Sequence, residues 1–244
     1  MLMEHLASLE QNPESRAEDG LTRRTFLRAS AAAGGGFLLS ISLPFSTPGA
    51  IAAEAAEFSP NAFVRIGRDN RVTFIMPQVE MGQGTYTSMS MLIAEELAID
   101  LDQIDVAAAP ANDQLYGNPL IGFQVTGGST SVRGFFTPLR EAGAVARTML
   151  IAAAAQRWQV DPATCRAEKG AVIDAKGNRR LSYGELADEA AKQPMPGKVA
   201  LKPAKDFTVI GTPAPRVDSP GKVNGSAQYG IDAKVPGMKI ATVA

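Results

Sequence analysis

Two short glycine-containing stretches carry the residues best suited to hold an anionic ligand. Residues 80–85 read EMGQGT and residues 126–131 read TGGSTS, and each stretch leads into a helical pattern. A glycine-rich turn before a helix leaves several backbone N–H groups unpaired and directed toward one point, where they bind anions. Because one stretch of chain carries two such turns, the sequence predicts a site for a large ligand that bears phosphate.

The composition excludes several other kinds of site. The 244-residue chain has a formal net charge of −1, with one cysteine, Cys165, and one histidine, His5. Near-neutral charge disfavours a nucleic-acid-binding protein. A single thiol cannot hold an iron–sulfur cluster, which takes about four cysteines, and a Cys/His zinc site is excluded in the same way. We interpret Cys165, at an expected strand start, as a buried and unreactive thiol.

Residues 1–53 resemble a twin-arginine signal peptide. Arg23 and Arg24 precede an alanine-rich apolar run, and small residues around Ala52 offer a cleavage site. The apolar run is shorter than the roughly 20 residues that span a bilayer; an uncleaved anchor is the alternative. Because the twin-arginine machinery exports folded proteins, the resemblance implies a periplasmic protein that acquires its cofactor in the cytoplasm.

Hydrophobic patterns predict the elements that position the two glycine loops. Apolar residues at helical spacing predict one helix after the first loop and a long helix over residues 131–158. β-prone runs predict a hairpin, a returning strand and a strand pair, over residues 63–76, 104–106 and 167–174. A short helix is expected over residues 181–193, followed by a proline-rich linker. We therefore predict an α+β fold with a mixed sheet and packed helices over residues 54–200. Residues 201–244 read as a linker and the beginning of a second, hammerhead-like α/β domain.

Some polar residues have less specific interpretations. The irregular residues 110–124 form a long loop, and such loops are often functional. Arg133, Arg140 and Arg147 recur every seven residues, which predicts a solvated charge stripe on one helix face. Arg133 is the exception, because the first helical turn is where an anion would bind. A further pair, Glu95-Glu96, lies off the apolar face of its helix.

Four motifs together resemble the molybdenum hydroxylases of the xanthine dehydrogenase and aldehyde oxidase family. These are EMGQG at residue 80, LIAEEL followed by IDV at residue 92, TGGSTSVRG at residue 126, and PRVD through KVNGSA to VPGM at residue 215. The isoquinoline 1-oxidoreductase β-subunit type is the most similar. The resemblance covers nearly all of the chain after residue 60, and it implies the N-terminal part of a molybdopterin-binding large subunit.

The resemblance implies a molybdenum-containing molybdopterin cofactor in its cytosine dinucleotide form. The residues expected to bind it are Gly82, Gln83, Gly84, Thr126, Gly127, Gly128, Ser129, Thr130, Ser131 and Arg133. The serine and threonine hydroxyls in this set could also serve as ordinary helix caps. Since this chain lacks the cysteines for a cluster, electrons would leave through a small [2Fe-2S] subunit. A cytochrome c or a quinone would then accept them.

The implied reaction is oxidation of an aldehyde or an N-heteroaromatic compound, with water as the oxygen source. The family's glutamate base and its later cofactor segments have no counterpart in these 244 residues, and none of Glu80, Glu95 and Glu96 matches that base. These residues are therefore expected to need the remainder of the large subunit and to be inactive alone. No catalytic residue or metal ligand is assigned within it.

Two alternatives remain open. The chain could be a non-catalytic exported binding or assembly module that keeps the fold without the chemistry. It could instead bind an ordinary dinucleotide, although neither loop has the Gly-x-Gly-x-x-Gly spacing that such sites use.

Overall fold

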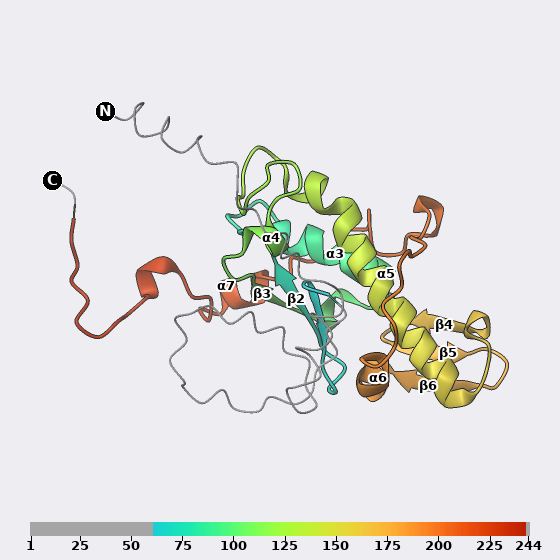
Figure 1. Cartoon of the computed structure of the whole chain (residues 1–244). Helices are drawn as coiled ribbons and strands as arrows, with labels where there is room; N and C mark the ends of the chain where they lie inside the picture. Colours follow the sequence, from blue (N-terminus) through green and yellow to red (C-terminus); the bar gives the residue numbers. More distant parts are fainter. Residues whose placement is uncertain (1–60, 243–244) are drawn as a thin grey trace, which may run out of the picture. The chain divides into compact units, whose positions relative to one another are not determined.

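The first part of the fold is a mixed three-stranded sheet. The computed structural model describes residues 61–242 (Figure 1), so the expected signal peptide, with Arg23 and Arg24, lies outside the described residues. Strand β1 (Val64–Ile66) pairs antiparallel with β2 (Val72–Met76), which pairs parallel with β3 (Ile104–Ala108). The predicted hairpin and returning strand are thus confirmed.

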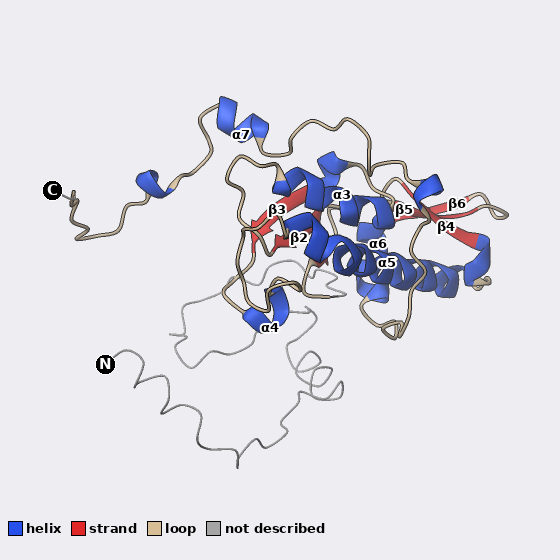
Figure 2. Ribbon diagram, turned by 90° about the horizontal axis from the view of Figure 1, so that it is seen from above, coloured by secondary structure: helices blue, strands red, loops and turns tan. Residues whose placement is uncertain are grey.

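Two helices pack together and carry the glycine loops at their N-terminal ends (Figure 2). Helix α3 spans Thr85–Leu97 and the long helix α5 spans Ser131–Trp158, as the sequence predicts. Gly143 makes their close approach possible, because a Cβ there would lie 3.0 Å from the Ile93 carbonyl oxygen. Helix α5 contacts both sheets and so connects the two halves of the core.

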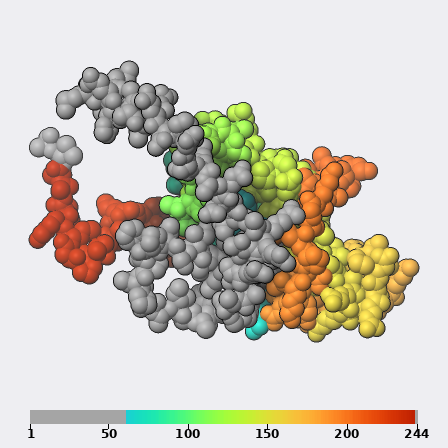
Figure 3. All heavy atoms as spheres, viewed as in Figure 1, coloured from blue at the N-terminus to red at the C-terminus, as the bar shows by residue number. Residues whose placement is uncertain are grey.

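The second sheet is antiparallel and has one strand more than the sequence predicts. Strands β4 (Cys165–Glu168), β5 (Ala171–Asp174) and β6 (Arg179–Ser182) follow one another in space as in sequence. Helix α6 (Tyr183–Ala190) begins directly after β6 with a capping box, in which the side chains of Ser182 and Glu185 each accept from the backbone N–H of the other. In the space-filling view this region, yellow and orange, forms one continuous surface (Figure 3).

The remaining elements are short. They are helices α4 (Asp113–Tyr116) and α7 (Ser219–Val223) and the 3-10 turns η1 (Leu101–Gln103), η2 (Pro162–Thr164), η3 (Ala204–Asp206) and η4 (Gly230–Asp232). Residues 211–242 contain no strand, so the second α/β domain stays a prediction. Between residues 61 and 242, no helix combines the length and the apolarity needed to cross a membrane.

The predicted charge stripe on α5 is wrong for two of its three arginines. Arg140 and Arg147 are turned inward, and both bind the carboxylate of Glu96, with N···O distances of 2.8 and 2.9 Å. Glu96 is fully buried, as is its neighbour Glu95. A buried carboxylate needs a paired cation or several donors, and α5 supplies the cations to α3. Of the three arginines only Arg133 is exposed, and it is the one that its place in the first helical turn sets apart from the stripe.

Cys165 begins β4 as predicted, but it is partly exposed. Burial is the largest of several effects that raise the pKa of its thiol above the ordinary value. The thiolate fraction at neutral pH is therefore low, which agrees with an unreactive cysteine.

Replacing Gly184 with alanine is expected to lower the free energy of unfolding by about 1–3 kcal/mol. Helix propensity alone predicts the opposite, a gain of about 1 kcal/mol. A Cβ at Gly184 would lie 2.4 Å from the Arg68 carbonyl oxygen and 2.9 Å from the Asn70 nitrogen, both backbone atoms of the β1–β2 turn. Urea denaturation measures the sign directly. Gly197→Ala is the control, because nothing lies within 4 Å of its added carbon; a stabilised Gly184→Ala protein would contradict this packing.

Candidate cofactor-binding site

The structure brings the two glycine loops side by side. The N–H of Val79 donates to the Thr126 hydroxyl at 2.8 Å, and the Ser131 hydroxyl donates to the Gln78 side-chain oxygen at 2.9 Å. Gln78 and Ser131 are both buried, so this contact is protected from water. The first loop continues from β2 into α3, and the second leads into α5. The packing of these two helices therefore places the loops next to each other.

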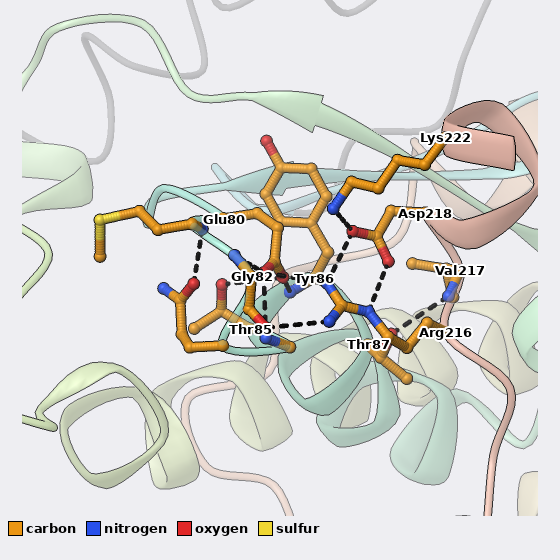
Figure 4. A network of polar contacts seen from close by, with 12 residues as sticks. Glu80, Gly82, Thr85, Tyr86, Thr87, Arg216, Val217, Asp218 and Lys222 are labelled. Carbon is orange, nitrogen blue, oxygen red and sulfur yellow. Dashed lines mark hydrogen bonds and ion pairs between the residues drawn. The ribbon is translucent and has the colours of Figure 1, made fainter. Parts of the chain in front are cut away.

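The first loop already contains its own anion (Figure 4). The Glu80 carboxylate accepts hydrogen bonds from the backbone N–H groups of Gly82, Gly84 and Tyr86, at 2.7, 3.0 and 3.1 Å. Burial by itself raises the pKa of Glu80, but these N–H groups outweigh it and the pKa lies below the ordinary value. Glu80 is therefore ionised at neutral pH. The sequence predicts that these backbone N–H groups bind a phosphate, but in the structure they bind a carboxylate from the same loop.

Gln83 also turns back on the first loop. Its side-chain oxygen accepts from the N–H of Met81, and its amide nitrogen donates to the Val79 carbonyl at 2.8 Å. Gly82 and Gly84 have φ values of 103° and 86°, which favour glycine. No atom lies within 4 Å of the position of a Cβ on either glycine. The outer edge of the loop thus faces open space on the side where the two glycines would carry a Cβ.

The second loop differs because its helix end is uncapped. The N-cap residue Thr130 makes no side-chain capping bond, since its hydroxyl donates to the Gly127 carbonyl at 2.7 Å and accepts from buried Asn118. Among the described residues, nothing accepts from the N–H groups of Ser131, Val132 and Arg133. These three N–H groups belong to the first turn of a 28-residue helix. The N-terminal end of a helix carries a partial positive charge and attracts anions.

The other predicted residues of the second loop fall into two sets. The Thr126, Thr130 and Ser131 hydroxyls are used within the protein. Gly127, Gly128 and Ser129 are exposed, and the last two lie in the left-handed region, with φ of 61° and 53°. Gly127 lies outside that region and has no atom within 4 Å of a Cβ position. Neither backbone conformation nor packing within the described chain requires glycine there.

A hollow of about 690 Å³ lies beside both loops. Gln78 and Val79 line it from the first loop and Thr126 from the second. Its other wall comes from the end of β3 and from residues 111–113, together with Tyr86 and Gln124. The sequence marks residues 110–124 as a functional loop but does not single out Asn112, Asp113, Gln124 or Tyr86. The side chain of Gln124 ties this loop together by accepting from the N–H of Asn112 at 2.9 Å.

A family model described as a molybdopterin cofactor-binding domain matches residues 22–235. The chain belongs to this family. The isoquinoline 1-oxidoreductase beta chain from Brevundimonas diminuta is 36% identical over 91% of the chain. This molybdopterin-binding protein is therefore of the xanthine dehydrogenase type that its motifs resemble.

Two other curated relatives are similar to the molybdopterin-binding chain. A membrane-bound aldehyde dehydrogenase from Gluconacetobacter polyoxogenes, named as a pyrroloquinoline-quinone enzyme, is 31% identical over 91% of it. A nicotinate dehydrogenase subunit from Pseudomonas putida is 32% identical over 72%. The chain spans 33% of the isoquinoline enzyme subunit, 29% of the aldehyde dehydrogenase and 14% of the nicotinate enzyme subunit. It thus corresponds to at most a third of these relatives.

Parts of two solved structures are also similar to the chain. Quinoline 2-oxidoreductase from Pseudomonas putida 86 matches 54% of this molybdopterin-binding chain and 16% of its own, with 19% identity and a TM-score of 0.42. Carbon monoxide dehydrogenase from Oligotropha carboxidovorans matches 51% and 15%, with 26% identity and a TM-score of 0.39.

The second loop of this molybdopterin-binding protein fits an anionic cofactor better than the first. It offers three unpaired N–H groups, the exposed Arg133 side chain and a glycine surface that nothing in the described chain covers. In the first loop, three N–H groups are already bound to Glu80. Within the part of the chain that the structure describes, no three His, Cys, Asp or Glu side chains gather as a metal site.

Proposed function

We propose that the chain is the cofactor-binding N-terminal portion of an exported molybdenum hydroxylase. Its substrate would be an aldehyde or an N-heteroaromatic compound, and water would supply the oxygen. The names of the relatives support both substrate classes, since they include isoquinoline, nicotinate and aldehyde enzymes. Family membership supports the molybdopterin cofactor, and the cytosine dinucleotide form is part of the proposal.

The uncapped first turn of α5 is the observation in this chain that best supports cofactor binding. The N–H groups of Ser131, Val132 and Arg133 bind a phosphate of the cofactor, and the Arg133 guanidinium adds a positive charge. Gly127 and Gly128 allow the cofactor to approach the backbone closely. When bound, the molybdenum centre supplies the two-electron oxidation chemistry. The first loop then acts as a preformed wall, since Glu80 already fixes its amides.

Parts of the enzyme other than these 244 residues complete it in this proposal. The remainder of the large subunit contributes the substrate pocket and the catalytic base. A small [2Fe-2S] subunit takes the electrons, because four cysteines are needed for a cluster and this chain has one. A cytochrome c is a candidate acceptor beyond it. Arg23 and Arg24 support export of the folded protein to the periplasm by the twin-arginine machinery.

We expect the chain to co-purify with its partner subunits from the periplasm of a molybdenum-replete host, with about one molybdenum and one pterin per assembly. Elemental analysis measures the metal, and fluorescence after oxidation measures the pterin. Nucleotide release by acid hydrolysis identifies cytosine. An assembly that forms in the periplasm but contains neither molybdenum nor pterin would overturn the proposal in favour of a non-catalytic binding module.

A further inference from the structure

The first glycine loop is held from outside by a residue far along the chain. The Arg216 guanidinium donates to the Gly82 carbonyl at 2.9 Å and to the Glu80 carboxylate at 3.1 Å, as Figure 4 shows. Arg216 therefore contacts both the backbone at the tip of the loop and the anion that organises its amides. These contacts join residues that are more than 130 positions apart in sequence.

Arg216 is itself fixed in place. Asp218 accepts two hydrogen bonds from its guanidinium, at 3.0 and 2.9 Å, and Lys222 binds the same carboxylate. Hydrogen bonding to Arg216 is the main cause that holds the pKa of Asp218 well below its usual range. The N–H of Val217 donates to the hydroxyl of buried Thr87 on α3 at 3.1 Å. The arginine is thus anchored by a forked ion pair and by a backbone contact to the helix that follows the loop.

The other restraints on the exposed tip of the first loop come from Glu80 and Gln83 of the loop itself. Met81, Gly82 and Gln83 are exposed, and the two glycines have open space around them. Glycine backbones have wide conformational freedom, so a loop built on them needs contacts to keep one shape. Glu80 provides such contacts from inside the loop. Its side chain is only 5% exposed, and Arg216 neutralises its charge there.

We propose that Arg216 is a positioning residue that clamps the first glycine loop, so that the segment after residue 210 sets the shape of one wall of the cofactor site. The clamp consists of Arg216, Asp218 and Lys222 acting on Glu80 and Gly82. The effect on cofactor binding rests on the proposed function, whereas the effect on the loop does not.

Amide hydrogen exchange of the purified full chain, without cofactor, tests the clamp. In Arg216→Ala we expect the N–H groups of Gly82, Gly84 and Tyr86 to exchange about tenfold faster, since charge-assisted hydrogen bonds are lost. Arg68→Ala is the matched control, because Arg68 forms an exposed ion pair with Asp188. It should leave the loop amides unchanged.

Two further variants separate positioning from general stability. Arg216→Lys keeps the charge but lacks the fork that reaches Glu80, Gly82 and Asp218 together, so we expect exchange to remain at least severalfold faster. In Glu80→Gln the loop amides exchange faster, and adding Arg216→Ala should accelerate them by much less than in the wild type. Wild-type exchange in Arg216→Lys, or fully additive effects in the double variant, would overturn the bridging role.

The same variants distinguish this inference from the proposed function. If Arg216→Ala loosens the loop but the wild-type assembly contains no molybdopterin, the clamp stands and the proposed function fails. If the wild-type assembly contains molybdopterin and Arg216→Ala leaves loop exchange unchanged, the clamp fails. Should Arg216→Ala not fold, Arg216→Lys and Asp218→Asn give the same measurement, with faster loop exchange expected in both.

Discussion

Replacing Glu95 with glutamine is expected to lower the free energy of unfolding by about 3–5 kcal/mol. The Glu95 carboxylate is fully buried on α3 and accepts from three consecutive backbone N–H groups, those of residues 208–210, at 2.8, 2.7 and 3.0 Å. It also pairs with the Lys202 ammonium group at 3.0 Å. One carboxylate oxygen accepts from the three backbone N–H groups and the other from Lys202, so a glutamine oxygen can serve only one of these two sets. The glutamine NH2 group then faces the other set of donors, and the charge that pairs with Lys202 is lost. Chemical denaturation measures the loss.

Glu141→Gln provides the matched control. Glu141 lies exposed on α5, where the same loss of charge should change stability by no more than about 0.5 kcal/mol. A loss below about 1 kcal/mol in Glu95→Gln would show that the buried carboxylate is not needed to hold the segment. We also expect a protease to cleave residues 202–210 faster in the Glu95 variant than in the control.

The difference between Glu95→Gln and the wild type should depend on pH. Burial of Glu95 raises its pKa, but hydrogen bonds from Val209, Ile210 and Lys202 outweigh this effect, and the pKa lies below the ordinary 4.5. A carboxyl whose pKa is lowered on folding contributes stability at pH values above its unfolded pKa. That contribution is lost as the pH falls through the folded pKa. The stability difference should therefore be constant above about pH 4.5–5 and shrink at lower pH.

Local sequence pattern was sufficient for helix α3 but not for its buried charges. Ile93 and Leu97 recur at helical spacing, so their helix could be read from the sequence. Glu95 and Glu96 lie off that stripe, so the pattern does not predict their burial. Their partners come from α5 and from residues 202–210, more than 40 and more than 100 positions away. No short-range pattern encodes contacts over such separations.

The second sheet shows a different limit. β6 has the sequence RRLS, and its two arginines do not give the alternation of a half-buried strand. Pairing with β5 provides the missing information, because Asp174 binds Arg179 at 2.6 Å across the strand pair. The change from strand to helix then occurs at Ser182 through its cap with Glu185. That capping box is visible in the sequence once the boundary is known.

The glycine loops were identified from sequence, but their roles were not distinguished. Both contain glycines before a helix, which predicts unpaired N–H groups. The sequence does not reveal that Glu80 folds back onto its own loop, since this depends on the backbone path through Gly82 and Gly84. It also does not reveal that Thr130 turns away from its helix. In the first loop the Glu80 carboxylate thus occupies the backbone N–H groups, whereas the N–H groups of the second loop stay unpaired within the described chain.

Replacing Gly127 with leucine is expected to reduce the molybdopterin content of the assembly at least tenfold while leaving its stability nearly unchanged. The Gly127 carbonyl accepts from the hydroxyl of Thr130, the N-cap residue of α5, so a leucine here adds bulk close to the turn where the proposed phosphate binds. Loss of charge-assisted hydrogen bonds to that phosphate costs about 1.5–3 kcal/mol, which corresponds to roughly ten- to more than a hundredfold weaker binding. Within the described chain nothing opposes the substitution, because no atom lies within 4 Å of a Cβ at Gly127.

Gly197→Leu controls for the substitution itself. Gly197 is also exposed and has no atom within 4 Å of its Cβ position, but it lies outside both glycine loops. We expect full cofactor content in this variant and unfolding free energies within about 0.5 kcal/mol of the wild type in both. Normal pterin and molybdenum content in Gly127→Leu would show that the phosphate does not bind at the first turn of α5. If Gly127→Leu alone lowers the free energy of unfolding by more than about 1 kcal/mol, the glycine is needed for folding. The open space around Gly127 would then no longer be evidence for a bound ligand.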